Sequence, residues 1–187
     1  MPLSNRKYQN TVPQPKKLGD TIYGNVQLIY NEIDLMESKN SNIDTVWIVD
    51  DDDEDHELII EIFKEARLNR PLKFFKGAKA MLKELENIHI APFIIICDVN
   101  LPGMDGFQLR ETLLEIPNNK FHSVPFIFWS TYASEAQIRK AFDLRAHGFF
   151  IKEPNYEEWK ASLIHIVEYW NKSRTPTKED KPDKPQL

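Results

Sequence analysis

The sequence predicts an α/β fold in which helices cover both faces of a parallel five-stranded sheet. Within residues 44–172, five short apolar segments alternate with five segments whose apolar residues recur at helical spacing. The apolar segments are rich in β-branched and aromatic residues and lack polar alternation, which is typical of strands buried on both faces. Strands that alternate with helices form right-handed crossovers, so this pattern predicts a parallel sheet.

The first half of this region contains three expected strands, at residues 45–50, 72–76 and 93–98. An acidic cluster at residues 50–55 follows the first strand and favours the positive N-terminus of a helix. That helix carries an apolar stripe formed by Leu58, Ile59, Ile62, Phe63 and Ala66. A second helix is expected over residues 78–87, where Met81, Leu82 and Leu85 share one face.

The second half contains strands at residues 125–130 and 148–152 and three further helices. The helix over residues 107–116 should end at Pro117, because proline lacks the N–H that a helix needs. Ser134 is a suitable N-cap for the helix over residues 134–146. The last helix, over residues 156–172, has an apolar face made of Trp159, Leu163, Ile166 and Trp170.

The segments outside this domain have a different character. Residues 1–43 form an N-terminal extension, in which residues 1–20 are expected to be a mobile arm. A helix is expected over residues 21–39, with a stripe of Ile22, Val26, Ile29, Ile33 and Met36. Docking on the protein's own domain and homodimerisation explain this stripe equally well. The charged, proline-containing tail, residues 173–187, is expected to be disordered.

Composition excludes several classes of protein. The apolar runs are only strand-sized, so no membrane-spanning segment is expected, and the N-terminus lacks the apolar core of a secretory signal. Cys97 is the single cysteine, which rules out an internal disulfide and favours the cytoplasm. The net charge of −5 argues against general nucleic-acid binding, and the five scattered histidines argue against a zinc site.

Polar residues lie at the carboxyl ends of four of the expected strands. The first strand delivers Asp50 and Asp51, the third Asp98, the fourth Ser130 and the fifth Lys152. The carboxyl ends of parallel strands meet at one edge of a sheet, where three carboxylates would repel one another without a cation. Oxygen ligands suit Mg²⁺, and a carboxylate beside Mg²⁺ can attack phosphorus to form an acyl phosphate. Each residue alone has an ordinary reading as a cap or surface group, but the combination favours phosphoryl chemistry.

These residues also lie in segments that resemble the receiver domains of response regulators in two-component signalling. The matching segments are IVDDD (48–52), IICDVNLPGMDGF (95–107), PFIFWST (125–131) and AHGFFIKEP (146–154). The resemblance implies a flavodoxin-like three-layer sandwich with strand order 2-1-3-4-5. It also implies that Asp98 is the phosphoacceptor and that Ser130 and Lys152 contact the phosphoryl group. Phe149 occupies the position of the switch aromatic.

The resemblance further implies a Mg²⁺ site formed by Asp50, Asp51, Asp98 and the main-chain carbonyl of Asn100. One departure concerns the segment after the fifth strand, where the family usually has Lys-Pro with a cis bond and this chain has Lys152-Glu153-Pro154. A cis bond before Glu153 would cost about 2.5–4 kcal/mol, so the reach of Lys152 is in question. Trp129 and Tyr132 are also bulky for an edge that must admit a phosphodonor.

The leading hypothesis is a single-domain response regulator that accepts a phosphoryl group from a histidine kinase or a histidine phosphotransfer protein. It would signal by protein contact through the surface formed by residues 133–170, and it would catalyse only its own phosphorylation and dephosphorylation. The first alternative is a pseudo-receiver that binds partners without being phosphorylated. The second is a phosphohydrolase with an Asp-x-Asp motif at residues 50–53, which would leave Asp98 without a role.

Overall fold

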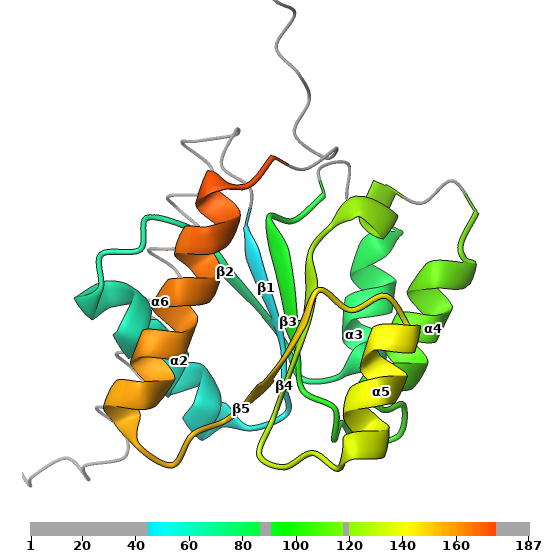
Figure 1. Ribbon diagram of the computed structural model, residues 1–187. Coiled ribbons are helices and arrows are strands. Elements are labelled where there is room, and N and C mark those ends of the chain that lie inside the picture. The colour runs from blue at the N-terminus through cyan, green and yellow to red at the C-terminus, as the bar shows by residue number, and fades with distance from the viewer. Residues whose placement is uncertain (1–44, 87–90, 118–119, 175–187) are drawn as a thin grey trace, which may run out of the picture.

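The computed structural model describes residues 45–86, 91–117 and 120–174, and these form a three-layer α/β/α sandwich (Figure 1). The strands are β1 (Val46–Val49), β2 (Leu72–Phe75), β3 (Ile94–Cys97), β4 (Phe126–Ser130) and β5 (Gly148–Ile151). All four strand pairs are parallel, and the order is β2-β1-β3-β4-β5. Both the predicted fold class and the predicted strand order are confirmed.

The helices divide between the two faces of the sheet, as Figure 1 shows. Helices α2 (Asp53–Glu65) and α6 (Tyr156–Lys172) cover one face. Helices α3 (Ala78–Leu85), α4 (Gly106–Glu115) and α5 (Glu135–Asp143) cover the other, and a short 3-10 helix spans Lys120–Ser123. No helix in the described part of the chain is long and apolar enough to cross a membrane.

Successive residues of each central strand contribute to different hydrophobic layers. Trp47, Ile95 and Phe128 pack beneath α3, α4 and α5 together with Cys97. The intervening strand residues, Ile48, Ile96 and Trp129, face α2 and α6. They belong to a second layer that includes Trp159 and Leu163 from the apolar face of α6. Both faces of the central strands are therefore buried, which explains why their sequences show no polar alternation.

The strand register brings the polar residues of interest to one edge of the sheet. Val49 pairs with Cys97, so Asp50 and Asp98 both follow directly after paired residues. The main-chain hydrogen bonds continue one step further, because Asp98 N donates to Val49 O at 2.9 Å and Lys152 N donates to Ser130 O at 2.8 Å. These residues are thus held by the sheet itself rather than by free loops.

Several helix ends differ from the expected positions. Helix α5 ends at Asp143, three residues before the expected end at residue 146, and Arg145 adopts a left-handed conformation with φ 54°. The guanidinium of Arg110, on α4, binds the chain just after the end of α5. Its Nε donates to Leu144 O at 3.1 Å and its Nη2 donates to Arg145 O at 3.0 Å. Burial lowers the pKa of Arg110 to about 10, with a further contribution from Arg145.

The terminal predictions lie largely outside the described residues. They comprise the arm at residues 1–20, the helix over residues 21–39 and all of the tail beyond residue 174. The choice between docking and dimerisation for the N-terminal stripe therefore stays open.

Candidate functional site

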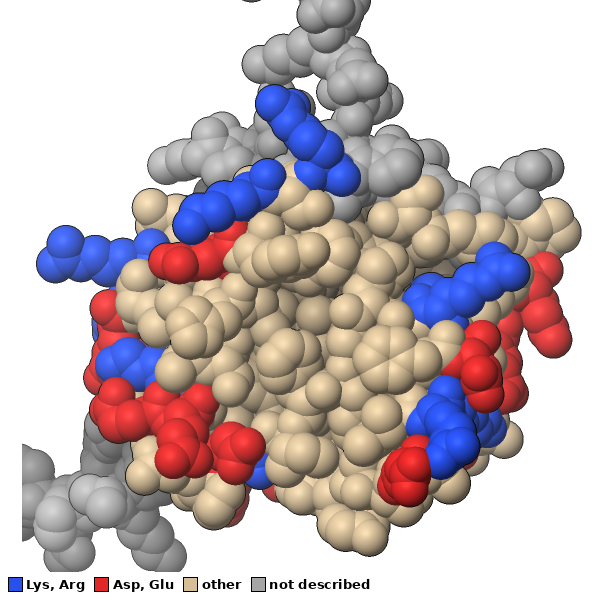
Figure 2. Space-filling view, viewed as in Figure 1, with Lys and Arg blue, Asp and Glu red and all other residues tan. Residues whose placement is uncertain are grey.

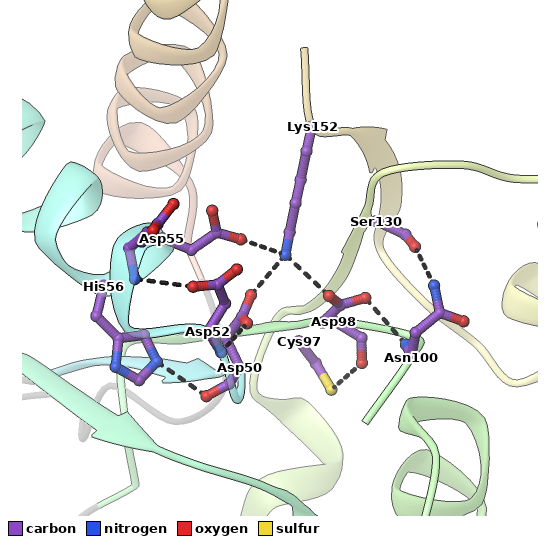
Figure 3. Close-up of polar contacts among 10 residues, drawn as sticks. Asp50, Asp52, Asp55, His56, Cys97, Asp98, Asn100, Ser130 and Lys152 are labelled. Carbon is purple, nitrogen blue, oxygen red and sulfur yellow. Dashed lines mark hydrogen bonds and ion pairs between the residues drawn. The ribbon is translucent and has the colours of Figure 1, made fainter. Parts of the chain in front are cut away.

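Three carboxylates surround one ammonium group at the carboxyl edge of the sheet (Figure 3). Lys152 Nζ lies 2.7 Å from Asp50 Oδ2, 2.6 Å from Asp55 Oδ2 and 2.8 Å from Asp98 Oδ2. The Lys152 side chain is only 8% exposed, and those of Asp50 and Asp98 are 5% and 11% exposed. The ammonium therefore uses its three N–H donors on three acidic residues, two of which follow central strands.

Main-chain N–H groups hold the second oxygen of two of these carboxylates. Asp50 Oδ1 accepts from Asp52 N at 3.0 Å, and Asp98 Oδ1 accepts from Asn100 N at 2.9 Å. Each of these carboxylates is thus fixed on one side by the backbone and on the other by Lys152. Such fixed geometry reduces the reorganisation that a reaction at either group would require.

The start of α2 brings Asp55 into the site. Asp52 caps this helix by accepting from Glu54 N at 2.8 Å, which places Asp55 in the first helical turn. Side chains on a helix lean towards its N-terminus, so Asp55 points back towards the ends of β1 and β3. Sequence reasoning assigned Asp55 only a favourable position near the helix dipole. One feature of the sequence could have indicated its role: Asp55 lies in the first turn of a helix that begins shortly after Asp50 and Asp51.

The charges of the site influence one another strongly. Burial disfavours the ammonium form of Lys152, but attraction to Asp50 and hydrogen bonds to all three carboxylates raise its pKa above the ordinary value. Burial raises the pKa of Asp50, although Lys152 opposes this shift. Burial also raises the pKa of Cys97 well above its usual range, with Asp98 adding to the shift. The Cys97 thiol is therefore neutral, and it belongs to the hydrophobic core.

Asn100 connects Asp98 to Ser130. Its backbone N–H donates to Asp98, and its side-chain Nδ2 donates to Ser130 Oγ at 3.2 Å. Ser130 is fully buried at the end of β4, whereas Asn100 is exposed. The Ser130 hydroxyl is therefore held close to the Asp98 loop in this structure.

The remaining expected residues lie around this cluster. Asp51 is exposed on the loop between β1 and α2, and Phe149 on β5 is half-buried, with its ring 6.0 Å from that of Phe128. Trp129 is buried in the layer below the site, where it contacts Trp159, and Tyr132 is exposed. The bulk of Trp129 therefore lies inside the fold rather than across the edge of the sheet.

A small cavity lies directly beneath the cluster. It has a volume of about 10 Å³ and is lined by both indoles, Trp129 and Trp159, together with Asp50, Asp98 and Lys152. These two tryptophans therefore line the same cavity as three of the charged groups.

A glycine permits the close approach of α4 to Asp98. A Cβ added at Gly106 would lie 2.3 Å from the main-chain oxygen of Asp98, a distance that atoms cannot adopt. Gly106 N also donates to Val99 O at 2.9 Å, and Asp105 caps α4 by accepting from Gln108 N at 2.7 Å. The Asp-Gly pair at 105–106 thus fixes the loop that follows the candidate acceptor.

The Lys-Glu-Pro segment does not prevent Lys152 from reaching the site. The described residues contain no cis peptide bond, and Lys152 Nζ still lies 2.8 Å from Asp98. The question that the missing Lys-Pro pair raised about the reach of this lysine is therefore answered.

The donor set fits a hard divalent cation in its chemistry. Asp50, Asp51 and Asp98 offer only oxygen atoms, and the exposed Asp51 leaves one side open to water, as Mg²⁺ and Mn²⁺ prefer. Within the described residues, no three His, Cys, Asp or Glu side chains are already grouped as a metal site. The Lys152 ammonium instead holds the carboxylates together.

Comparisons with known proteins identify the family that the chain resembles. The response regulator receiver domain model matches residues 46–164. The probable methanogenesis regulatory protein FilR2 of Methanothrix harundinacea (strain 6Ac) is 25% identical over 73% of this chain and 88% of its own. Response regulator Rcp1 of Synechocystis sp. (strain ATCC 27184 / PCC 6803 / Kazusa) is 26% identical over 67% of this chain and 87% of its own.

The fold is shared with solved structures of response regulators. The crystal structure of the phosphorylated cyanobacterial phytochrome response regulator RcpA superimposes with a TM-score of 0.64 and 21% identity, covering 72% of this chain and 99% of RcpA. The Mn²⁺-bound form of Rcp1 superimposes with a TM-score of 0.62 and 20% identity, covering 70% of this chain and 96% of Rcp1.

Proposed function

The chain belongs to the response regulator receiver domain family, and we propose that it signals through phosphorylation of Asp98. The observation that carries the proposal is the position of the Asp98 carboxylate, which lies between the Lys152 ammonium at 2.8 Å and the Asn100 N–H at 2.9 Å. Asp50 also contacts Lys152 and a main-chain N–H directly after a central strand, but only the partner of Asp98, Asn100, also donates to the Ser130 hydroxyl, at 3.2 Å.

The donor is a phosphohistidine of a histidine kinase or of a histidine phosphotransfer protein. An oxygen of Asp98 attacks the phosphorus, the P–N bond to the donor histidine breaks, and an aspartyl phosphate forms. Phosphoryl transfer depends mainly on positioning and on neutralising the equatorial oxygens. Lys152 supplies a positive charge for this purpose, and Ser130 supplies a hydroxyl donor.

A divalent cation, Mg²⁺ in the cell, completes this site. Asp50, Asp51, Asp98 and the main-chain carbonyl of Asn100 would hold it, and when bound it neutralises charge on the phosphoryl oxygens. The oxygen-only donor set supports this assignment. The chain's own residues align the acceptor carboxylate and keep the ammonium beside it.

The signal then passes from Ser130 to the protein surface. A phosphoryl oxygen on Asp98 would accept a charge-assisted hydrogen bond from the Ser130 hydroxyl, and such bonds are about twice as strong as bonds between neutral groups, such as the one that Asn100 Nδ2 donates to Ser130 Oγ. Moving towards it, Ser130 would leave Asn100 and make room for the half-buried Phe149 to turn inwards. Phosphorylation would thereby bias a two-state equilibrium.

The surface formed by residues 133–170 is the proposed site of partner binding. It carries exposed apolar side chains on α5, β5 and α6, namely Ile138, Phe142, Ile151 and Tyr169. Figure 2 shows uncharged residues across the centre of this side, with most Lys, Arg, Asp and Glu near its margin. Such a surface suits a protein partner or a second copy of the chain, whereas the net charge of −5 disfavours nucleic acid. We place this signalling in the cytoplasm, where Cys97 remains reduced.

Intact-mass measurement with an acyl phosphate donor tests the proposal. The protein is incubated with Mg²⁺ and acetyl phosphate, and Asp98→Asn serves as the matched variant because it removes the nucleophile while keeping the shape. Wild type should gain one phosphoryl group that the variant does not gain. No gain at high donor concentration would favour the pseudo-receiver, and continued release of phosphate from phosphate esters would favour the hydrolase.

A further inference from the structure

Asp55 accepts a hydrogen bond from Lys152 but has no other role in the proposed phosphorylation site. Its Oδ2 lies 2.6 Å from Lys152 Nζ, the shortest of the three carboxylate contacts, and its side chain is 22% exposed. The other two acceptors, Asp50 and Asp98, belong to the proposed divalent-cation site. Lys152 and a divalent cation therefore compete for the same two carboxylates, and Asp55 lies outside that competition.

We propose that Asp55 is a positioning residue that holds the Lys152 ammonium beside Asp98 while Asp50 and Asp98 bind a divalent cation. This inference rests on the proposed function of the site. Asp55 comes from α2 and reaches Lys152 from the side away from Asn100 and Ser130, as Figure 3 shows. It thus keeps the lysine within reach of a phosphoryl group on Asp98 without occupying the acceptor itself.

The charge arrangement gives this role a physical basis. Without the Asp55 carboxylate, the buried ammonium has only Asp50 and Asp98 as charged acceptors, and a buried charge is stable only when it is paired. It would then bind those two groups more tightly and resist replacement by a cation. Asp55 reduces this resistance because it offers the ammonium a partner that remains when a cation is bound.

A neighbouring residue provides a matched control. Asp53 lies in the same first turn of α2 and also forms an ion pair, but its Oδ2 contacts Lys76 Nζ at 2.7 Å, away from Lys152. Asp53→Asn and Asp55→Asn remove the same charge near the same helix terminus. A general effect on the helix or on the net charge would therefore appear in both variants.

The test uses the full chain and Mn²⁺, whose free concentration electron paramagnetic resonance reports directly. Asp55→Asn should raise the dissociation constant for Mn²⁺ about tenfold, as loss of an outer partner of a metal site does. Asp53→Asn should change it by less than about twofold, because exposed ion pairs contribute little. Asp55→Glu keeps the carboxylate and should recover most of the affinity.

A second measurement needs neither metal nor phosphate. The ¹H–¹⁵N NMR signal of the Lys152 ammonium should be resolved in wild type and in Asp53→Asn, because its protons are held in hydrogen bonds, and should broaden in Asp55→Asn. At saturating Mg²⁺, phosphorylation by acetyl phosphate should also be slower in Asp55→Asn. Unchanged Mn²⁺ affinity and an unchanged ammonium signal would overturn the role of Asp55.

The two proposals fail in different ways. If Asp55→Asn weakens Mn²⁺ binding and broadens the ammonium signal while wild type accepts no phosphoryl group, Asp55 holds the lysine but the proposed function is wrong. If wild type is phosphorylated and Asp55→Asn equals it in affinity, signal and rate, the proposed function stands and the inference about Asp55 is wrong.

Discussion

Replacing Lys152 with methionine tests the electrostatic description of the site most severely. Lys152→Met keeps the length of the side chain and leaves Asp50, Asp55 and Asp98 without their shared cation. Breaking a buried ion pair by removing one partner costs about 3–5 kcal/mol. Asp55 is 22% exposed and retains some hydration, so we expect a loss near the lower limit, about 3 kcal/mol in the free energy of unfolding. For a domain of this size, that corresponds to a fall in Tm of roughly 10 °C.

The pH dependence identifies the cause of this loss. Burial raises the pKa of Asp50 and Lys152 opposes the rise, so removing the lysine lifts the folded-state pKa of Asp50 further above the unfolded value of about 3.9. The folded variant then binds more protons than the unfolded chain, and its stability decreases as pH rises through that window. The difference from wild type should therefore be largest at neutral pH and should shrink as the pH falls towards about 4.

Urea denaturation at pH 7.5 and pH 4.5 measures this directly. Lys160→Met is the control, because Lys160 pairs with Glu65 on the surface and should show a much smaller loss that differs little between the two pH values. A loss for Lys152→Met that is the same at both pH values would refute the electrostatic reasoning. So would a loss no larger than that of the control.

Two further variants test the packing of α4 by urea denaturation. Gly106→Ala places a Cβ 2.3 Å from the main-chain oxygen of Asp98, so α4 must shift. We expect the free energy of unfolding to fall by about 2–3 kcal/mol and phosphorylation to be slower. A fully stable and active variant would contradict the close approach. Arg110→Met removes the donors to Leu144 O and Arg145 O. We expect the free energy of unfolding to fall by about 1.5–3 kcal/mol. An unchanged urea midpoint would contradict this role of Arg110.

The fold was predictable because its determinants are local and repeated. The apolar segments at β1, β3 and β4 have no polar alternation, and the structure buries them on both faces, so one pattern was enough to predict a parallel sheet. The same topology rule predicts that Asp50, Asp98 and Lys152 share one edge, where the structure places them. Their roles in phosphorylation stay a prediction.

Contacts between distant elements were not predictable from residue type alone. Asp55 is one of several acids in residues 50–55, and only the helix start at Asp53 turns it towards Lys152, 97 residues away. Arg110 lies between Leu109 and Glu111 on α4, and its partners are carbonyl oxygens, which carry no sequence signal. The early end of α5 follows from the left-handed Arg145, a residue type with no preference for that conformation.

The central claim is that the phosphoryl group resides on Asp98. An aspartyl phosphate is reduced by borohydride to homoserine, and this change remains in the peptide after proteolysis. Wild type treated with Mg²⁺ and acetyl phosphate should show the mass change at residue 98 alone, and omission of donor should abolish it. Reduction at Asp50, Asp51 or Asp55, or at no residue while phosphate is incorporated, would contradict the account.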